Sequence, residues 1–209
     1  CEKSGVLNLG VEGMMLIGAV FGFAAVTVTG APMLGVFAGA LAGIFASLIF
    51  GFLTLSLLSN QVATGLALTI FGTGLSALFG LEYVGKTIEQ IEPIYIPLLT
   101  DLPIIGRILF GHDPLIYLAI GILGLTAWFL RRTRAGMILR AVGDSDYSAH
   151  AIAYPVIAIR YAAVAFGGAM AGLGGAYLSL AYTPLWAENM SAGRGWIALA
   201  LVVFASWRP

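Results

Sequence analysis

Residues 11–29 read VEGMMLIGAVFGFAAVTVT, an apolar run that a single acidic residue interrupts near its start. A helix rises about 1.5 Å per residue, so about 20 residues of such a run cross the hydrocarbon core of a bilayer. The run therefore predicts a membrane-spanning helix. Further runs of this kind follow at about Leu34–Leu58, Gln61–Gly80, Pro114–Leu130, Tyr161–Ala181 and Arg194–Trp207. We expect an all-α, polytopic membrane protein with about six transmembrane helices.

The composition of the whole chain agrees with that fold class. Of its 209 residues, 60% are apolar and 10% are Lys, Arg, Asp or Glu, whereas about 25% of the residues in a soluble domain are charged. A soluble globule of this length could not cover so much apolar surface with so few charges. The formal net charge of zero also excludes a nucleic-acid binder, which needs a basic excess.

The charges are divided between two long links, and this division predicts the topology. The link 131–160 carries half of the ten basic residues, and the link 81–113 carries half of the ten acidic residues. Because Lys and Arg collect on the cytoplasmic side, we place 131–160 in the cytoplasm and 81–113 outside, as an external loop. Alternation then puts residues 1–10 inside and Tyr182–Gly193 outside. We expect the whole chain, 1–209, to form one transmembrane domain.

Glycines recur one turn apart within the predicted spans, as Gly35, Gly39 and Gly43 and again as Gly168 and Gly172. Small residues at this spacing let helix backbones approach each other closely in a membrane. We interpret these glycines as packing positions of a compact helical bundle, which carry no information about a substrate.

Two patterns suggest cofactor chemistry, but neither fits the rest of the chain. Gly80–Thr87 matches the phosphate-loop pattern GxxxxGK[ST], which needs a buried strand before it and a helix after it. Here a membrane span precedes the match, and the charge bias places it outside, away from cytoplasmic ATP. His112 and His150 lie on opposite expected faces, and the single Cys lacks ligand partners at a useful spacing. We expect no enzyme activity, catalytic residue, metal site or cofactor in this chain.

Polar residues near the span ends are the stronger functional signal, because a polar group in a membrane is unfavourable unless it is paired or faces water. Transporters build broken helices and re-entrant turns from glycine-flanked polar segments around a solute path. Helix capping or packing is the alternative explanation. On this basis the candidates for lining a translocation path, here called the path candidates, are Asn8, Glu12, Asn60, Gln61 and Asn189.

A basic amphipathic stretch, Arg131–Asp144, begins the link that we place in the cytoplasm, and a short helix-like piece that ends at Pro155 follows it. A helix that lies along the cytoplasmic surface is suited to docking a partner protein. The alternative is a solvated loop whose arginines only fix the topology. The residues alone leave both interpretations open.

Several longer strings resemble those of a known family. They are SGVLNLGVEGMML at 4–16, RAVG at 140–143, GLGGAYLS at 172–179, ENMSAGRGWIALAL at 188–201 and WRP at 207–209. With these strings the chain resembles the permease subunits of bacterial ABC importers. The branch is the nucleoside and simple-sugar one, in the family that also holds ribose and branched-chain amino-acid permeases. The resemblance implies a bacterial plasma (inner) membrane location and a piece of a longer permease.

The resemblance also implies partners and roles. A second permease subunit, identical or different, would share the membrane lipid with this chain, and cytoplasmic ABC ATPase subunits would bind ATP and Mg. An external or lipid-anchored binding protein would deliver the solute, a nucleoside or a simple sugar, to a path past the five path candidates. The coupling helix of the family falls on Arg140–Tyr154, and the residues implied in ATPase coupling are Arg140, Gly143, Asp144, Ser148 and Ala149.

Two other functions are kept as alternatives. An ATP-independent secondary transporter or channel would use a titratable residue inside the membrane, and Glu12 is the one acidic residue within a predicted span. A membrane-embedded structural subunit would have no solute path, so replacing Asn8, Glu12 and Gln61 with apolar residues would leave uptake intact.

Overall fold

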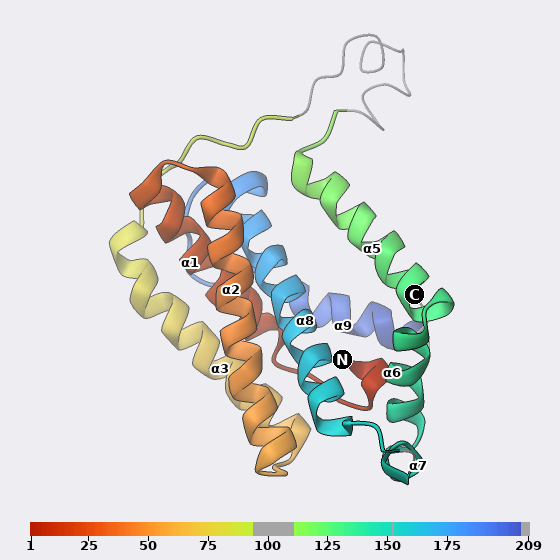
Figure 1. Ribbon diagram of the computed structural model, residues 1–209. Coiled ribbons are helices and arrows are strands. Elements are labelled where there is room, and N and C mark those ends of the chain that lie inside the picture. The colour runs from red at the N-terminus through yellow and green to blue at the C-terminus, as the bar shows by residue number, and fades with distance from the viewer. Residues whose placement is uncertain (94–110, 152, 206–209) are drawn as a thin grey trace.

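The computed structural model describes residues 1–93, 111–151 and 153–205. Within these ranges the chain is helical apart from connecting segments and two isolated β-bridges, Val84–Trp186 and Thr87–Leu185. Two π-helical turns, Phe52–Ser56 and Leu178–Tyr182, extend α2 and α8. The α-helices in Figure 1 are α1 Val11–Thr29, α2 Pro32–Gly51, α3 Gln61–Gly80, α5 Pro114–Arg132, α6 Arg134–Asp144, α7 Asp146–Ala151, α8 Val156–Tyr177 and α9 Arg194–Phe204.

Five helical segments are long and apolar enough to span a membrane, which confirms the predicted all-α, polytopic fold. The sixth predicted span, Arg194–Trp207, needs correction. Its described part is the 11-residue helix α9, which at about 1.5 Å per residue reaches about half of the hydrocarbon core. The end of that predicted span, residues 206–207, lies outside the described residues. The five segments are Val11–Thr29, Pro32–Ser56, Gln61–Tyr83, Pro114–Arg132 and Val156–Tyr182.

Glycines let α1, α2 and α8 pack backbone against backbone at the centre of the bundle. A Cβ atom on Gly43 would collide with the carbonyl oxygen of Gly168, and one on Gly172 would collide with that of Gly39. On α1, a Cβ atom on Gly18 would collide with the backbone of Gly172. The packing role predicted from the glycine spacing is confirmed, because these contacts leave no room for a side chain.

Helix α1 begins about two turns deeper in the bundle than α3. Gly13, two residues after the start of α1, lies against Leu68, Thr69 and Gly72, which follow the start of α3 by seven to eleven residues. The two helix starts are therefore offset by five to nine residues, or about 10 Å along the helix axis at about 1.5 Å per residue. The shift continues to the other end, where the rings of Phe21 and Phe79 pack with their centroids 5.4 Å apart. The residues just before α1 therefore lie alongside the first turns of α3.

The connection from α8 to α9 turns back along the bundle. Trp186 is buried against Gly80 at the end of α3, whereas Ser191 and Gly195 contact Glu12 in the first turn of α1. The sequence predicts that Tyr182–Gly193 lies outside. Instead, the end of this segment re-enters the bundle as far as the start of α1, and α9 crosses the molecule from there (Figure 1).

The two long links leave the bundle at opposite ends, as the predicted alternation requires (Figure 1). Residues 81–93 lie at the same end as the turn between α1 and α2, and α6 and α7 lie at the other end. Most of the predicted external loop, residues 94–110, lies outside the described residues. Which end faces the cytoplasm stays a prediction from the charge bias.

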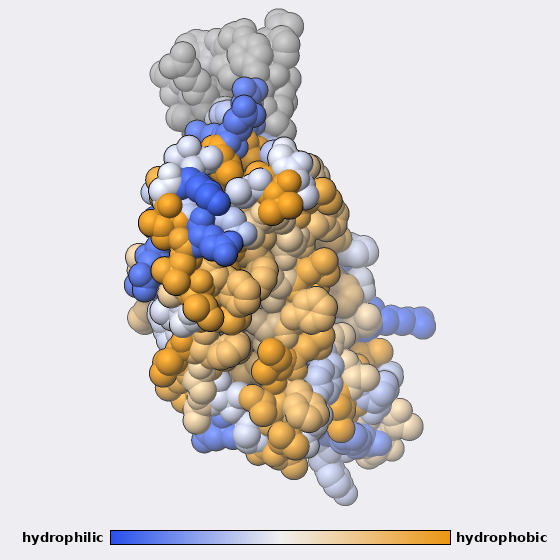
Figure 2. Space-filling view, turned by 90° about the vertical axis from the view of Figure 1, so that its left-hand side faces the viewer, coloured by the Kyte–Doolittle hydropathy of each residue, from blue (hydrophilic) through white to orange (hydrophobic). Residues whose placement is uncertain are grey.

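The surface of the bundle carries a wide apolar area. Figure 2 shows this area on one side of the molecule, with hydrophilic residues gathered mainly toward the ends. In the described chain no residue of α5 is buried, and the main neighbour of this helix is α6. Exposed apolar side chains on α2 and α3 include Phe37, Leu41, Phe45, Phe52, Val62, Leu66, Ile70 and Leu78.

Candidate functional site

The candidate site is built around a non-helical segment, Val6–Gly10, that runs between a 3₁₀ turn (Glu2–Ser4) and α1. Gly5, with φ +78°, ends the 3₁₀ turn in the left-handed region that favours glycine, and Gly10 stands at the N-cap position of α1. A non-helical backbone within a membrane bundle needs partners for its polar groups, because lipid supplies none. The neighbouring side chains supply them.

Side chains of α3 and of the segment itself satisfy its backbone. The amide of Leu7 donates to Gln61 Oε1 at 2.8 Å, and Thr69 Oγ1 donates to the carbonyl oxygen of Leu9 at 3.2 Å. The amide of Gly10 donates to Asn8 Oδ1 at 2.9 Å. Asn8 is 1% exposed, and its Nδ2 contacts Met14 Sδ at 3.5 Å. In this structure Asn8 and Gln61 therefore hold the segment in place.

Glu12 connects this segment to the re-entrant turn before α9. Its side chain is 4% exposed and accepts three hydrogen bonds. Ser191 Oγ donates to Oε1 at 2.5 Å, the amide of Gly193 donates to Oε1 at 2.8 Å, and the amide of Gly195 donates to Oε2 at 2.6 Å. A carboxylate at the N-terminus of a helix is stabilised by free amides and by the helix dipole. Glu12 therefore caps α9, a helix that follows it by more than 180 residues.

The glycines of the re-entrant turn make this contact possible. Gly193 has φ +82° and is the N-cap residue of α9. A Cβ atom on Gly195 would lie 2.6 Å from Glu12 Oε2 and 2.8 Å from Glu12 Cα. A side chain at Gly195 would push α9 away from the carboxylate.

The structure brings three of the five path candidates together. Asn8 and Glu12 lie on the segment and on the first turn of α1, and Gln61 contacts the segment from α3. Asn60 is exposed and caps α3 by accepting from the amides of Val62 and Ala63 at 2.9 and 3.1 Å. Asn189 is exposed in the re-entrant turn, with φ +54°. These two residues lie apart from the three that surround the segment.

The residues implied in ATPase coupling lie at the end of the bundle that α6 and α7 form. Ala149 is buried in a small apolar cluster with Val142 and Val156. Asp144 and Ser148 are exposed, so their side chains are open to a partner. Arg140 is partly buried, and its Nε is a buried nitrogen without a hydrogen-bond partner among the described residues. Residue 152 of the predicted coupling region lies outside the described residues.

This end of the bundle is attached to the 3₁₀ turn that precedes the non-helical segment. Gly143 packs against the backbone of Lys3 and Gly5, where a Cβ atom would collide with the Lys3 carbonyl. Arg160 Nε donates to the carbonyl oxygen of Ser4 at 3.1 Å, and its Nη1 lies 3.6 Å from Asp146 Oδ2. In the sequence, Arg160 is only the last basic residue of the link 131–160. No sequence signal shows its contact with Ser4, because Ser4 lies 156 residues away.

The phosphate-loop match does not have the geometry of a nucleotide site. Gly80 ends a helix and packs against the indole of Trp186, and the residues after it form a 3₁₀ turn and two bridges to the segment 185–186. Lys86 Nζ lies over the Tyr83 ring, 5.2 Å from its centroid. Within the described ranges, no three His, Cys, Asp or Glu side chains come together as a metal site.

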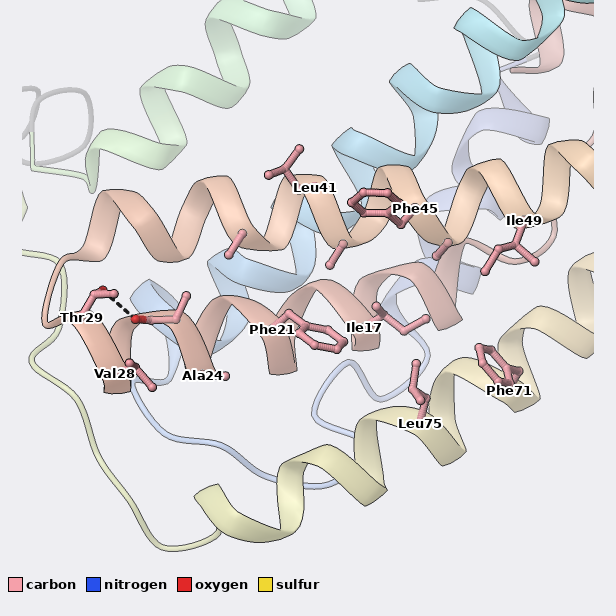
Figure 3. Close-up of a pocket in the computed structure, with 14 residues that line it drawn as sticks. Ile17, Phe21, Ala24, Val28, Thr29, Leu41, Phe45, Ile49, Phe71 and Leu75 are labelled. Carbon is pink, nitrogen blue, oxygen red and sulfur yellow. Dashed lines mark hydrogen bonds between the residues drawn. The ribbon is translucent and has the colours of Figure 1, made fainter.

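A groove of about 700 Å³ between α1, α2 and α3 is too apolar to bind a polar solute (Figure 3). Phe21, Leu41, Phe45 and Leu75 are among the side chains that line it. Its hydroxyl group, on Thr29, donates to the carbonyl oxygen of Ala25 at 2.6 Å and is therefore already paired. We infer that the polar centre around Glu12, and not this groove, is the candidate functional site.

The whole chain, residues 1–209, matches the family described as the permease component of the branched-chain amino acid transport system. It is 44% identical to the putative glucose ABC transporter permease protein TsgC13 of Haloferax volcanii, over all of this chain and 64% of that protein. It is 34% identical to the nucleoside ABC transporter permease protein NupC of Lactococcus lactis and 32% identical to the guanosine ABC transporter permease protein NupQ of Bacillus subtilis. Each match covers all of this chain and 69% of the relative. No solved structure matches the chain.

Proposed function

The chain belongs to the permease family of the branched-chain amino acid transport system, as its sequence strings predict, and from this we propose that it is the membrane-spanning subunit of an ABC importer. The solute would be a nucleoside or a simple sugar, since the relatives named above are permeases for glucose, nucleosides and guanosine. The chain spans about two thirds of the length of these relatives, and the proposal concerns the whole permease. A bacterial plasma (inner) membrane is its proposed location.

The observation that supports this proposal is the polar junction, which we define as Val6–Glu12 together with Ser191–Gly195. It places a non-helical segment and a re-entrant turn about two helical turns inside the bundle, and the carboxylate of Glu12 joins them. Irregular backbone at membrane depth is tolerated where it is buried in protein or lines a water-filled cavity. Transporters use such breaks to form a solute path.

In the proposed mechanism, partner subunits hydrolyse ATP, complete the solute path and deliver the solute. A cytoplasmic ABC ATPase pair would bind and hydrolyse ATP with Mg, and its movement would reach this chain through the exposed face of α6 and α7. Arg160 and Gly143 would pass the movement to residues 3–5 and so to the polar junction. A second permease subunit would complete the path, and an external binding protein would deliver the solute. Rigid-body rocking of the subunits would open the path to each side in turn.

The geometry does not favour the alternative of an ion-coupled secondary transporter. A coupling carboxylate must exchange protons or ions with the path, but three protein donors already occupy the oxygens of Glu12. Its contacts fit a structural cap better than a coupling site.

The test is uptake by the full permease, reconstituted in liposomes with its ATPase, its binding protein and any second permease subunit. We expect uptake of labelled guanosine or glucose that requires ATP on the ATPase side. Uptake driven by an ion gradient without ATP would support the secondary transporter. Uptake of neither solute under any condition would overturn the proposed function.

A second test addresses the coupling surface. Asp144→Arg changes an exposed residue, so the complex should assemble, but the charge reversal should uncouple ATP hydrolysis from uptake. The matched control is Glu82→Arg, an exposed acidic residue at the opposite end of the bundle, which should leave the ratio of ATP hydrolysed to solute transported unchanged. Unchanged uptake with Asp144→Arg would contradict the assignment.

A further inference from the structure

The end of α8 presents two tyrosines on one face because it is π-helical. Tyr177 and Tyr182 are five residues apart, which in an α-helix with 3.6 residues per turn places side chains about 140° apart. In the π-helical turn Leu178–Tyr182 the hydrogen bonds run between residues five apart, as from the amide of Thr183 to the carbonyl oxygen of Leu178 at 3.0 Å. The two tyrosine ring centroids accordingly lie 6.4 Å apart, with 41° between the ring planes.

Arg194 completes this pair with a positive charge. Its guanidinium carbon lies 4.7 Å from the centroid of the Tyr182 ring. Arg194 is the first residue of α9, where the helix dipole disfavours a cation. Neither of the two ion pairs in the described ranges involves it. Helix stability therefore does not explain an arginine at this position.

The backbone on both sides of Arg194 is held by Glu12. The amides of Gly193 and Gly195 donate to the two carboxylate oxygens, so the side chain between them leaves from a fixed point of the polar junction. Tyr182 is 58% exposed, Arg194 is exposed, and Tyr177 is partly buried. The three side chains thus form an open face directly beside the re-entrant turn. π-Helical turns of this kind occur frequently at functional sites.

We propose that Tyr177, Tyr182 and Arg194 form a contact site for the ring of the transported solute, an inference that rests on the proposed function. The ligand class is a polar ring with an apolar face and oxygen acceptors on its edge, which describes both a nucleoside and a pyranose sugar. The tyrosine rings stack on the apolar face, and the guanidinium donates hydrogen bonds to the edge oxygens. The site lies next to the polar junction, so a conformational change there alters the position of Arg194 relative to the tyrosines.

Solute protection against thiol labelling tests this site without measuring transport. In the full permease with its partner subunits, Cys1 is replaced by Ser, and Tyr182→Cys or Arg194→Cys is labelled with a membrane-impermeant reagent. The matched control is Leu81→Cys, at an exposed residue just after α3. We expect guanosine or glucose to slow labelling at 182 and 194 and not at 81, and the solute that protects identifies the ligand. Equal labelling at all three positions with both solutes would overturn the site.

Uptake measurements separate this inference from the proposed function. Loss of stacking on an aromatic side chain should lower the uptake rate of Tyr182→Ala about 5- to 150-fold. Tyr182→Phe keeps the ring and should transport at a rate close to that of the unmodified permease. If the unmodified permease transports a solute that gives no protection, the site is wrong and the function stands. Protection by a solute that is never transported would leave the site standing and overturn the function.

Discussion

The contact of α2 with α8 and the contact of α1 with α9 each hold two helices together inside the bundle, but by different interactions. Between α2 and α8, glycines such as Gly43 and Gly168 bring the backbones of two helices into direct contact. At the polar junction, α1 and α9 both start at the Glu12 carboxylate, which accepts hydrogen bonds from the Ser191 hydroxyl and from two backbone amides. The first contact depends on glycines, which have no side chain, and the second depends on the side chain of Glu12. We infer that the first is the fixed scaffold and the second is where the bundle can rearrange.

The largest effect should come from filling the glycine contact. Gly172→Val places a branched side chain against the backbone of Gly39 and Gly43, and overpacking of this kind costs about 1–3 kcal/mol and occasionally more. We expect little folded protein after purification in detergent. The control is Gly174→Val, two residues further along α8, where a Cβ atom would meet only Met15 Cε at 3.8 Å. A normal yield of the Gly172 variant would show that α2 and α8 can separate.

A smaller effect should come from removing the carboxylate at the polar junction. Glu12→Ala leaves the Ser191 hydroxyl and the amides of Gly193 and Gly195 without their acceptor, and an unsatisfied buried donor costs about 1–3 kcal/mol. We expect a lower unfolding temperature in detergent and loss of uptake. Glu12→Gln keeps one acceptor oxygen, so its unfolding temperature should lie between those of Glu12→Ala and the unmodified permease.

The control for Glu12 is Glu188→Ala, a change at an exposed residue just before the same turn. Its unfolding free energy should change by no more than about 0.5 kcal/mol. If Glu12→Ala were as stable as this control, the proposed cap would have no energetic importance.

The smallest of the three effects should come from the link between the junction and the α6–α7 end. Arg160→Gln removes the hydrogen bond from Arg160 Nε to the Ser4 carbonyl, and a hydrogen bond to a charged group contributes about 1.5–3 kcal/mol, less where it is partly exposed. Folding should survive, and the amount of ATP hydrolysed per solute transported should rise. Arg134→Gln, at an exposed residue of α6, should leave this ratio unchanged. Equal ratios in the two variants would contradict a mechanical role for Arg160.

The helical spans could be predicted from the sequence, because a helix that crosses lipid needs a long apolar run, and such runs are evident in the sequence. Val11–Thr29 and Gln61–Gly80 begin and end in the structure where the runs do. The glycine contacts were predictable for a similar reason, since their spacing follows the helix period. The family was predictable from the strings around Glu12 and before α9, and the family match covers the whole chain, residues 1–209.

The site itself could be predicted only in part. Polarity selected Asn8, Glu12 and Gln61, but it could not show that Glu12 caps a helix 182 residues further along the chain. The helix period places Tyr177 and Tyr182 on different faces, and only the π-helical turn brings them together. Long-range pairs and departures from the regular helix are set by tertiary packing, which no local pattern contains.

The outward shift of α1 relative to α3 has a consequence for the bilayer itself. Because Phe21 is level with Phe79 near the end of α3, the last two turns of α1 extend past α3 by about 10 Å. Tyr83 packs on Phe23 there with ring centroids 5.9 Å apart, and Ile88, Ile91 and Trp186 cover the same cluster. Protein therefore covers the face of α1 that carries Phe23, whereas Val28 on another face is 79% exposed. We expect bilayer thickness to be sensed by the exposed faces of α1, α3 and α5, and the covered face of α1 to be shielded from it.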